Sequence, residues 1–444
     1  MQSGYDAYKK IALNIWDYAE VGFKETKSSV LLQNTLKDNG FKIDAGVAGM
    51  PTAFVATYGS GSPVIAILAE YDALPGLSQE STSAKTPIAN RNSGHGCGHN
   101  LFGTGSVAAG IAIKKLIDEG KIKGTVKVYG SPAEEGGDGK VYMVREGLFK
   151  DVDVVLHWHP DEHNTVTYTS SLAIKTAKFR FYGISAHAAG APDKGRSALD
   201  AVEAMDYMVN MMREHIPQET RIHYVITNGG KAPNVVPDFA EVFYYVRNPY
   251  KDITESLFER VVNTAKAAAL GTETKMEYEI ISGSHDLLIN KTLAANMQSN
   301  LEKVGGVTYT ADEVKFAKNL QATFLGKVPS IDSAALITPL YFEKNQGSTD
   351  VGDVSYVVPT VGVETATWVP GTSAHSWQAV ACSGNDIGIK GMMVAAKTIA
   401  FTAIDLFSNP ALIIKAKEEF KTMKGDYKYR PLLGDRKPAL NYRD

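Results

Sequence analysis

Two histidines and a cysteine lie within five residues of one another in the sequence GHGCGHN, residues 94–100. Thiolate sulfur and imidazole nitrogen are ligands that transition metals prefer in proteins. The glycines between them let the backbone turn tightly and approach a bound ion. Residues 101–119 follow with the small, apolar composition of a helix, and Asn100 is its expected N-cap. We therefore expect the cluster where a loop enters a helix, although a glycine-rich turn with a buried cysteine explains this stretch equally well.

A pair of carboxylates, Glu134 and Glu135, follows the strand predicted at residues 124–129. One carboxylate of such a pair can bind a metal ion, while the other takes a proton from metal-bound water as a general base. A bound metal ion lowers the pKa of water to about 7, so hydroxide becomes available near neutral pH. Acidic pairs are usually solvated turns, but the position after a strand and before two glycines favours a site.

More candidate ligands follow other predicted strands. His157 and His159 come after residues 153–156, and both would lie on one side if that strand continued, although only one need be a ligand. His375 lies far along the chain in a loop of serine, alanine and tryptophan, and by itself would be a surface histidine. Thiolate, imidazole and carboxylate together suit zinc, manganese, cobalt or nickel rather than magnesium or calcium.

The elements that must position these residues alternate between strand and helix, which predicts a mainly parallel α/β sheet. In such sheets ligands bind beyond the carboxyl ends of the strands. The glycine-rich cluster, the glutamate pair and the histidine pair all lie at such ends or in the loops after them. Three ligand-type clusters at one edge are much less probable by chance than any one of them alone.

The chain length of 444 residues favours two domains. From about residue 172 the pattern changes to alternating strands and helices in the order β-α-β-β-α-β, which is typical of a ferredoxin-like (α+β) domain. We predict a catalytic domain formed by residues 1–171 and 284–444, with residues 172–283 inserted as a lid and dimerisation domain.

Composition bears on the partners and the location of the protein. The net charge of −3 and the lack of long basic runs argue against nucleic acid. Two distant cysteines do not make a disulfide framework, so a reducing cytoplasm is the expected location. Residues 387–407 are apolar, but the two lysines among them and the α/β context predict a core helix rather than a membrane span.

The motifs GHGCGHN, SPAEEGG, LHWHP, SAHAAGAPDKGRSALDAV and SAHSW occur in this order. In this order they resemble the aminoacylase/glutamate-carboxypeptidase family of di-metal amidohydrolases, and within it the branch that uses a cysteine ligand. The group in that branch that acts on aminobenzoyl-glutamate is the best match. The resemblance covers essentially the whole chain, and its first two motifs are the most specific. It implies two divalent transition-metal ions per chain, manganese or zinc, with cobalt or nickel also compatible.

The resemblance also assigns roles to individual residues. The implied metal ligands are Cys97, His99, Glu135, His157 and His375. Glu134 would be the general base, and His187 of the inserted domain would polarise the scissile carbonyl in the partner subunit's active site. Asn234 and Arg247 would bind the substrate's carboxylate, a task that suits the planar guanidinium fork. A homodimer through the inserted domain is therefore expected, with a related subunit as a further possible partner.

The chain departs from the family pattern at residues 68–75, LAEYDALP, where the family usually has RADMDALP. Glu70 replaces the usual orienting aspartate, so either Glu70 or Asp72 could support the metal site. His159 is an additional histidine, and His95 has no assigned role. These differences concern the substrate more than the type of reaction.

The expected function is hydrolysis of the amide bond of an N-acyl amino acid, with p-aminobenzoyl-glutamate or a related folate fragment as the favoured substrate. A dipeptidase or carboxypeptidase acting on small dipeptides is the alternative within the class. A non-catalytic subunit of a hetero-oligomeric hydrolase is the alternative outside it, but such a chain would be expected to have lost a ligand or the base.

Overall fold

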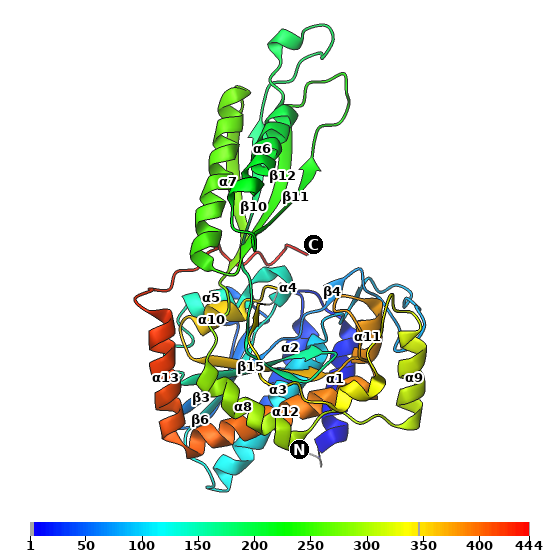
Figure 1. Ribbon diagram of the computed structural model, residues 1–444, viewed down its shortest axis with the longest axis vertical. Helices are drawn as coiled ribbons and strands as arrows, with labels where there is room; N and C mark the ends of the chain where they lie inside the picture. The colour runs from blue at the N-terminus through cyan, green and yellow to red at the C-terminus, as the bar shows by residue number, and fades with distance from the viewer. Residues whose placement is uncertain (1–3, 345–346, 444) are drawn as a thin grey trace.

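A central sheet of seven strands organises the larger part of the computed structural model, which describes residues 4–344 and 347–443 (Figure 1). The strand order is β1-β2-β6-β3-β7-β15-β8. The inner strands β6, β3, β7 and β15 are parallel, and β1, β2 and β8 are antiparallel to their neighbours. The strands are β1 (Lys42–Ala45), β2 (Phe54–Gly59), β3 (Val64–Ala69), β6 (Thr125–Gly130), β7 (Val154–Asp161), β8 (Thr165–Thr167) and β15 (Thr360–Ala366). The prediction of a mainly parallel α/β sheet is confirmed.

Two long helices, α3 (His99–Asp118) and α12 (Asp386–Ser408), pack against each other and against the parallel strands. Among the described helices, α12 is the one long and apolar enough to cross a membrane, but 78% of its apolar window is buried inside the fold. It is therefore a core helix, as its sequence context predicts. The other helices of this part are α1 (Tyr5–Tyr18), α2 (Thr26–Asp38), α4 (Glu134–Gly137), α5 (Gly139–Arg145), α8 (Lys291–Val304), α9 (Ala311–Gln321), α10 (Val351–Ser355), α11 (Trp377–Ser383) and α13 (Pro410–Lys424).

A second sheet, with its own buried apolar core, projects from the first part (Figure 1). Its strands are antiparallel in the order β11-β12-β10-β13, and two helices pack on it. Its elements are β10 (Ala173–Tyr182), α6 (Ala198–Met212), β11 (Arg221–Asn228), β12 (Phe239–Asn248), α7 (Lys251–Gly271) and β13 (Lys275–Ser284). This is the predicted β-α-β-β-α-β order, and we call this part the lid. The predicted domain boundaries stay a prediction. Residues 1–3 and 444, which were assigned to the catalytic domain, lie outside the described residues.

Residues 425–443, which we call the strap, follow α13 and pass along the base of the lid (Figure 1). The sequence of this segment is polar, yet Leu432 and Leu433 are only 2% exposed each. Leu432 packs against Gly283 at the end of β13, and Arg430 pairs with Glu255 of α7 at 2.9 Å. The strap therefore contacts the lid before it reaches the loop that carries the glutamate pair.

Candidate metal centre and active site

The glycine-rich cluster enters α3 through Gly98, whose φ of 75° closes the turn before His99. A side chain at this position would meet Pro160, because a Cβ would lie 2.7 Å from the proline ring. The expected N-cap, Asn100, lies instead in the first turn of the helix and donates through Nδ2 to the Ala12 and Ser383 carbonyls. Glycine takes the cap position because it adopts the left-handed backbone without strain and has no side chain to collide with Pro160.

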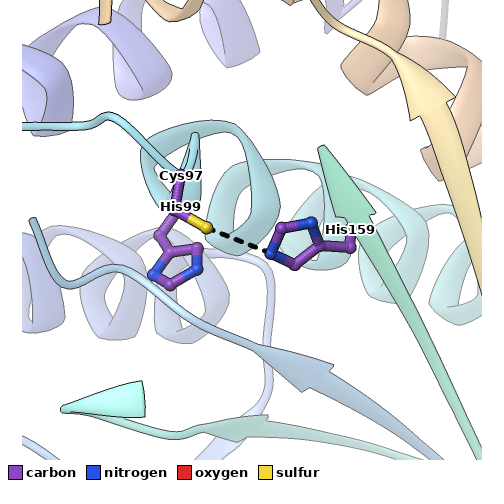
Figure 2. Close-up of side chains that lie close together, drawn as sticks. All are labelled: Cys97, His99 and His159. Carbon is purple, nitrogen blue, oxygen red and sulfur yellow. Dashed lines mark hydrogen bonds between the residues drawn. The ribbon is translucent and has the colours of Figure 1, made fainter. Parts of the chain in front are cut away.

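Cys97, His99 and His159 form a first group of donors, each offering an atom within 4.8 Å of the others (Figure 2). The Cys97 sulfur lies 3.4 Å from Nε2 of His159. The other ring nitrogen of His159, Nδ1, is 2.8 Å from the Pro160 carbonyl, to which it can donate. A hydrogen bond of this kind fixes the tautomer and leaves Nε2 free to bind a metal ion.

Glu135 and His375 form a second group of donors with Cys97. Nε2 of His375 lies 3.2 Å from Oε1 of Glu135. The His375 backbone N–H donates to the Gly96 carbonyl at 2.9 Å, and this bond attaches the distant loop to the glycine-rich cluster. A third group joins His99 to Glu70 and Glu134. The first and second groups share Cys97, and the first and third share His99. The three groups are therefore adjacent, and together they have enough donors for more than one ion.

His157 and His159 lie on the same face of β7, because that strand runs to Asp161 instead of ending at residue 156. Pairing with β15 extends it, and His157 lies directly opposite Gly362, where a Cβ would come within 2.3 Å of the imidazole. Nε2 of His157 is buried without a hydrogen-bond partner, yet the residue belongs to none of the donor groups formed by described residues. Its role as a ligand stays a prediction, whereas the extra histidine, His159, faces Cys97.

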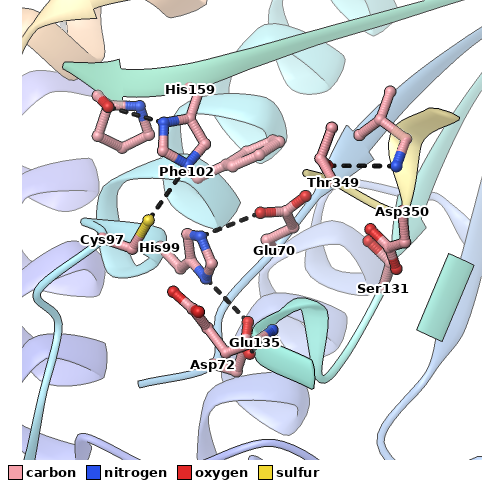
Figure 3. Close-up of polar contacts among 12 residues, drawn as sticks. Glu70, Asp72, Cys97, His99, Phe102, Ser131, Glu135, His159, Thr349 and Asp350 are labelled. Atoms are coloured by element: carbon pink, nitrogen blue, oxygen red, sulfur yellow. Dashed lines mark hydrogen bonds and ion pairs between the residues drawn. The ribbon is translucent and has the colours of Figure 1, made fainter. Parts of the chain in front are cut away.

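Glu70 and Asp72, which the sequence could not separate, contact opposite nitrogens of His99 (Figure 3). Asp72 accepts from Nδ1 at 2.8 Å and, through its second oxygen, from the Glu135 backbone N–H at 2.9 Å. Glu70 lies on the Nε2 side, 3.1 Å away, where a metal ion would bind. Asp72 therefore orients His99, and Glu70 offers an oxygen to the site itself.

A buried lysine, Lys140, holds Glu70 in place. Its Nζ lies 2.6 Å from Oε1 of Glu70 and 2.7 Å from Oδ1 of Asp350, and its backbone N–H donates to the second oxygen of Asp350 at 2.8 Å. Lys140, Glu70 and Asp350 are at most 2% exposed. Sequence reasoning missed Lys140 and Asp350, because a lysine directly after Gly139 and an aspartate 210 residues later carry no local signal of a contact.

Burial and neighbouring charge shape the ionisation of the site. Burial and the carboxylates of Glu70, Glu135 and Asp350 raise the pKa of Glu134 well above its ordinary value. Burial, together with Lys140 and His159, lowers the pKa of His157 to about 3, so this imidazole is neutral. Burial and the carboxylate of Glu135 raise the pKa of Cys97. A bound cation would favour the thiolate and offset these effects.

The residues present fit a transition-metal centre. Four buried atoms that could bind a metal ion make no hydrogen bond among the described residues, namely Glu70 Oε2, His99 Nε2, Glu135 Oε1 and His157 Nε2, although Glu70 Oε2 lies 3.1 Å from His99 Nε2 and Glu135 Oε1 lies 3.2 Å from His375 Nε2. Buried polar atoms are almost always satisfied, so this concentration at one place indicates that a ligand completes it. Sulfur, imidazole and carboxylate donors are the set that zinc, manganese or cobalt accepts.

Glu25 supports the turn that carries the glutamate pair, and sequence reasoning missed it. Its Oε1 accepts from the Ala133 backbone N–H at 2.8 Å, and its Oε2 accepts from the Thr52 hydroxyl at 3.0 Å. Ala133 has a φ of 56°, a strained conformation for a residue with a Cβ, so this bond helps to hold the turn before Glu134. A glutamate 108 residues upstream gives no sequence signal of this contact.

The donor groups open into a cavity of about 620 Å³ between the central sheet and the base of the lid. Arg247 lines this cavity, because its place in β12 lies opposite Ile174, near the start of β10. His187 and Asn234 do not line it. They lie in loops beyond the far end of β10, where the Ala188 backbone N–H donates to the Asn234 carbonyl at 3.0 Å. Of the three lid residues predicted to act on the substrate, Arg247 therefore lines the cavity of its own chain, whereas His187 and Asn234 lie away from it.

The chain matches the family model described as "Peptidase family M20/M25/M40" over residues 66–337. It is 40% identical to one of the subunits of the p-aminobenzoyl-glutamate hydrolase of Escherichia coli, over 95% of this chain and 93% of that protein. It is 32% identical to the Xaa-Arg dipeptidase of Mus musculus, over 84% of this chain and 78% of that protein. A dinuclear metal-binding peptidase of the M20 family from Bacillus subtilis has the same fold, with a TM-score of 0.61, 16% identity and coverage of 92% and 99% of the two chains. The family match and the extent of these similarities confirm the resemblance, and the chain belongs to the peptidase family M20/M25/M40, a family of hydrolases.

Proposed function

We propose that this protein hydrolyses the amide bond of an N-acyl amino acid, with p-aminobenzoyl-glutamate or a related folate fragment as substrate. The observation that carries the proposal is the single cavity in which the donor groups, Glu134 and Arg247 meet. The curated relative that is 40% identical is named for this reaction. All five predicted ligand positions and the base position hold competent residues, which argues against a non-catalytic subunit.

The residues that would hold the metal ions are Cys97, His99, Glu135, His375 and His159, with Glu70 and His157 as further donors. Two divalent ions, manganese or zinc, with cobalt or nickel also compatible, suit this donor set. When bound, such ions lower the pKa of water and polarise the amide carbonyl.

Glu134 takes a proton from the attacking water as the water oxygen bonds to the carbonyl carbon. It then gives this proton to the nitrogen of the leaving amine as the carbon–nitrogen bond breaks. Its carboxylate lies in the donor group with His99 and Glu70, so it is close enough to the metal site for both proton transfers. Arg247 can bind the carboxylate of the amino acid through two hydrogen bonds.

The assembly that we propose is a homodimer formed through the lid, in which His187 acts in the partner's active site. Its support is that His187 lies away from its own cavity and that the lid leaves an edge strand open. This strand, β11, exposes Val225 at 57% and Ile226 at 40%. A related subunit remains an alternative partner, since the Escherichia coli relative is itself named as a subunit. The free cysteines Cys97 and Cys382 are consistent with a reducing cytoplasm.

A dipeptidase acting on substrates with a basic residue is the second candidate. Asp161 and Glu364 line the same cavity, and a cationic side chain could approach them. Their carboxylates already pair with His163, at 3.0 and 3.5 Å. These ion pairs weaken the case for a basic substrate.

The test combines metal analysis with a substrate panel. Protein purified without chelator and without a metal-binding tag should contain about two transition-metal ions per chain. It should hydrolyse p-aminobenzoyl-glutamate faster than dipeptides that end in arginine or lysine. Glu134→Gln should keep the metal and lose turnover by at least about a hundred-fold. Metal-free protein that takes up neither manganese nor zinc would refute the proposal.

A further inference from the structure

The last residues of the strap reach the loop of the glutamate pair. The Tyr442 hydroxyl donates to the Glu135 carbonyl at 3.1 Å, and Nη2 of Arg443 donates to the same oxygen at 2.6 Å. Earlier contacts fix the path of the strap, since the Arg145 guanidinium donates to the Arg436 carbonyl at 2.7 Å and the Tyr142 hydroxyl donates to the Lys437 carbonyl at 3.3 Å. The strap thus brings a second guanidinium, besides Arg247, to the wall of the cavity.

Part of the hydrogen-bonding capacity of Arg443 is unused. A guanidinium has five N–H donors, but Nε of Arg443 is buried without a hydrogen-bond partner among the described residues. The guanidinium stacks on the Tyr442 ring, with Cζ 4.6 Å from the ring centroid. Among the described residues, Arg443 forms no ion pair with a carboxylate within 4.0 Å. A neutral carbonyl that already accepts from Tyr442 does not require this positive charge.

Arg247 also has an unused hydrogen-bond donor. Its Nε is also buried without a hydrogen-bond partner, and its guanidinium stacks over the Tyr245 ring at 5.4 Å. Lys140, the other cation near the metal site, is already neutralised by Glu70 and Asp350. The cavity therefore has two guanidiniums with unused donors, one from the lid and one from the strap. A ligand with two carboxylates would satisfy both.

We propose that Arg443 binds the side-chain carboxylate of the substrate's amino acid, so that the enzyme selects N-acyl derivatives of dicarboxylic amino acids. In this arrangement Arg247 binds the α-carboxylate, and the two groups together fix the amide over the metal site. The inference rests on the proposed amidohydrolase function and deepens it by assigning selection to the strap. Arg443 is a specificity-determining residue in this reading, because it touches the substrate away from the reacting atoms.

The test compares two substrates of nearly equal size, N-(4-aminobenzoyl)glutamate and N-(4-aminobenzoyl)glutamine. The wild-type protein should prefer the glutamate compound. Arg443→Gln should reduce the ratio of the two kcat/KM values by about 10- to 100-fold, mainly through KM, with metal content unchanged. Arg443→Lys keeps the positive charge but not the planar pair of N–H donors, so its kcat/KM ratio should fall less than that of Arg443→Gln. Arg247→Gln and Tyr442→Phe are matched controls that should affect both substrates alike.

Calorimetric binding of free glutamate and free glutamine to the metal-loaded protein gives a readout that does not depend on turnover. Wild-type protein should bind glutamate more tightly, and Arg443→Gln should lose this preference. An equal loss of activity on both substrates would mean that Arg443 only holds the Glu135 loop, and no loss would mean that it does not touch the substrate. Either result overturns the inference. If wild-type protein hydrolyses neither compound but binds glutamate through Arg443, the proposed function and the substrate selection built on it both fail, and only a carboxylate-binding site at Arg443 is shown.

Discussion

Replacing Lys140 by methionine tests whether the buried charge network is as the structure has it. The lysine side chain is fully buried, and its Nζ contacts Glu70 at 2.6 Å and Asp350 at 2.7 Å. Methionine has a similar length but no charge, so the variant leaves two carboxylates buried without their cation. Breaking one buried ion pair in this way costs about 3–5 kcal/mol, and we expect a loss of at least this size in the free energy of unfolding.

The assay is urea unfolding of the metal-free protein, followed by tryptophan fluorescence. Trp16, Trp158, Trp368 and Trp377 all lie outside the lid, so the signal reports the part of the molecule that contains Lys140. Lys390→Met is a matched control. That lysine pairs with Glu313 at 2.6 Å but is 28% exposed, and we expect a loss of about 1 kcal/mol or less.

The double variant Lys140→Met/Asp350→Asn should recover part of the lost stability, because it removes one of the two unpaired charges. The stability lost in Lys140→Met should also depend on pH. Burial and Glu70 raise the pKa of Asp350 to about 7, against the opposing effect of Lys140, and loss of the lysine raises it further. A carboxyl whose pKa is raised in the folded state makes stability fall as pH increases, so the deficit should be smaller at pH 5 than at pH 8. A loss no larger than that of Lys390→Met, or strict additivity with Asp350→Asn, would refute the reasoning.

Three further predictions concern the metal ligands, the lid and the dimer. His159→Ala should reduce metal content more than His157→Ala does, as measured by elemental analysis, because His159 faces Cys97; the opposite order would show that His157 is the stronger ligand. Burial raises the pKa of Asp206 in α6 to about 6, against an unfolded value of about 3.9, so stability should fall as pH rises from about 4 to 6. Asp206→Asn should flatten that fall in pH-dependent unfolding experiments, and an unchanged slope would exclude this carboxyl as its source. Mixing inactive His187→Ala with inactive Glu134→Gln should restore part of the activity if His187 works across a dimer, whereas no recovery after subunit exchange would contradict that arrangement.

The sequence by itself determined the types of donor, the family and the local elements. Apolar and polar residues alternate over residues 173–182, a pattern that predicts a half-buried strand, and β10 has these bounds. The cysteine, histidines and glutamate pair were identified because their chemistry and their positions after strands are visible along the chain. These features are local, and a single sequence is enough to recognise them.

Only the tertiary structure decided which of several suitable residues lie close together. β7 continues past residue 156 because β15 pairs with it, and this pairing directs His159 toward Cys97. Lys140 meets Asp350 across 210 residues, and Arg443 meets Glu135 across 308. Periodicity describes which face of one element is buried, but it has no information about which distant segment covers that face. The donors of the metal centre could therefore be predicted from the sequence, whereas the side chains that support and complete it depended on packing between distant segments.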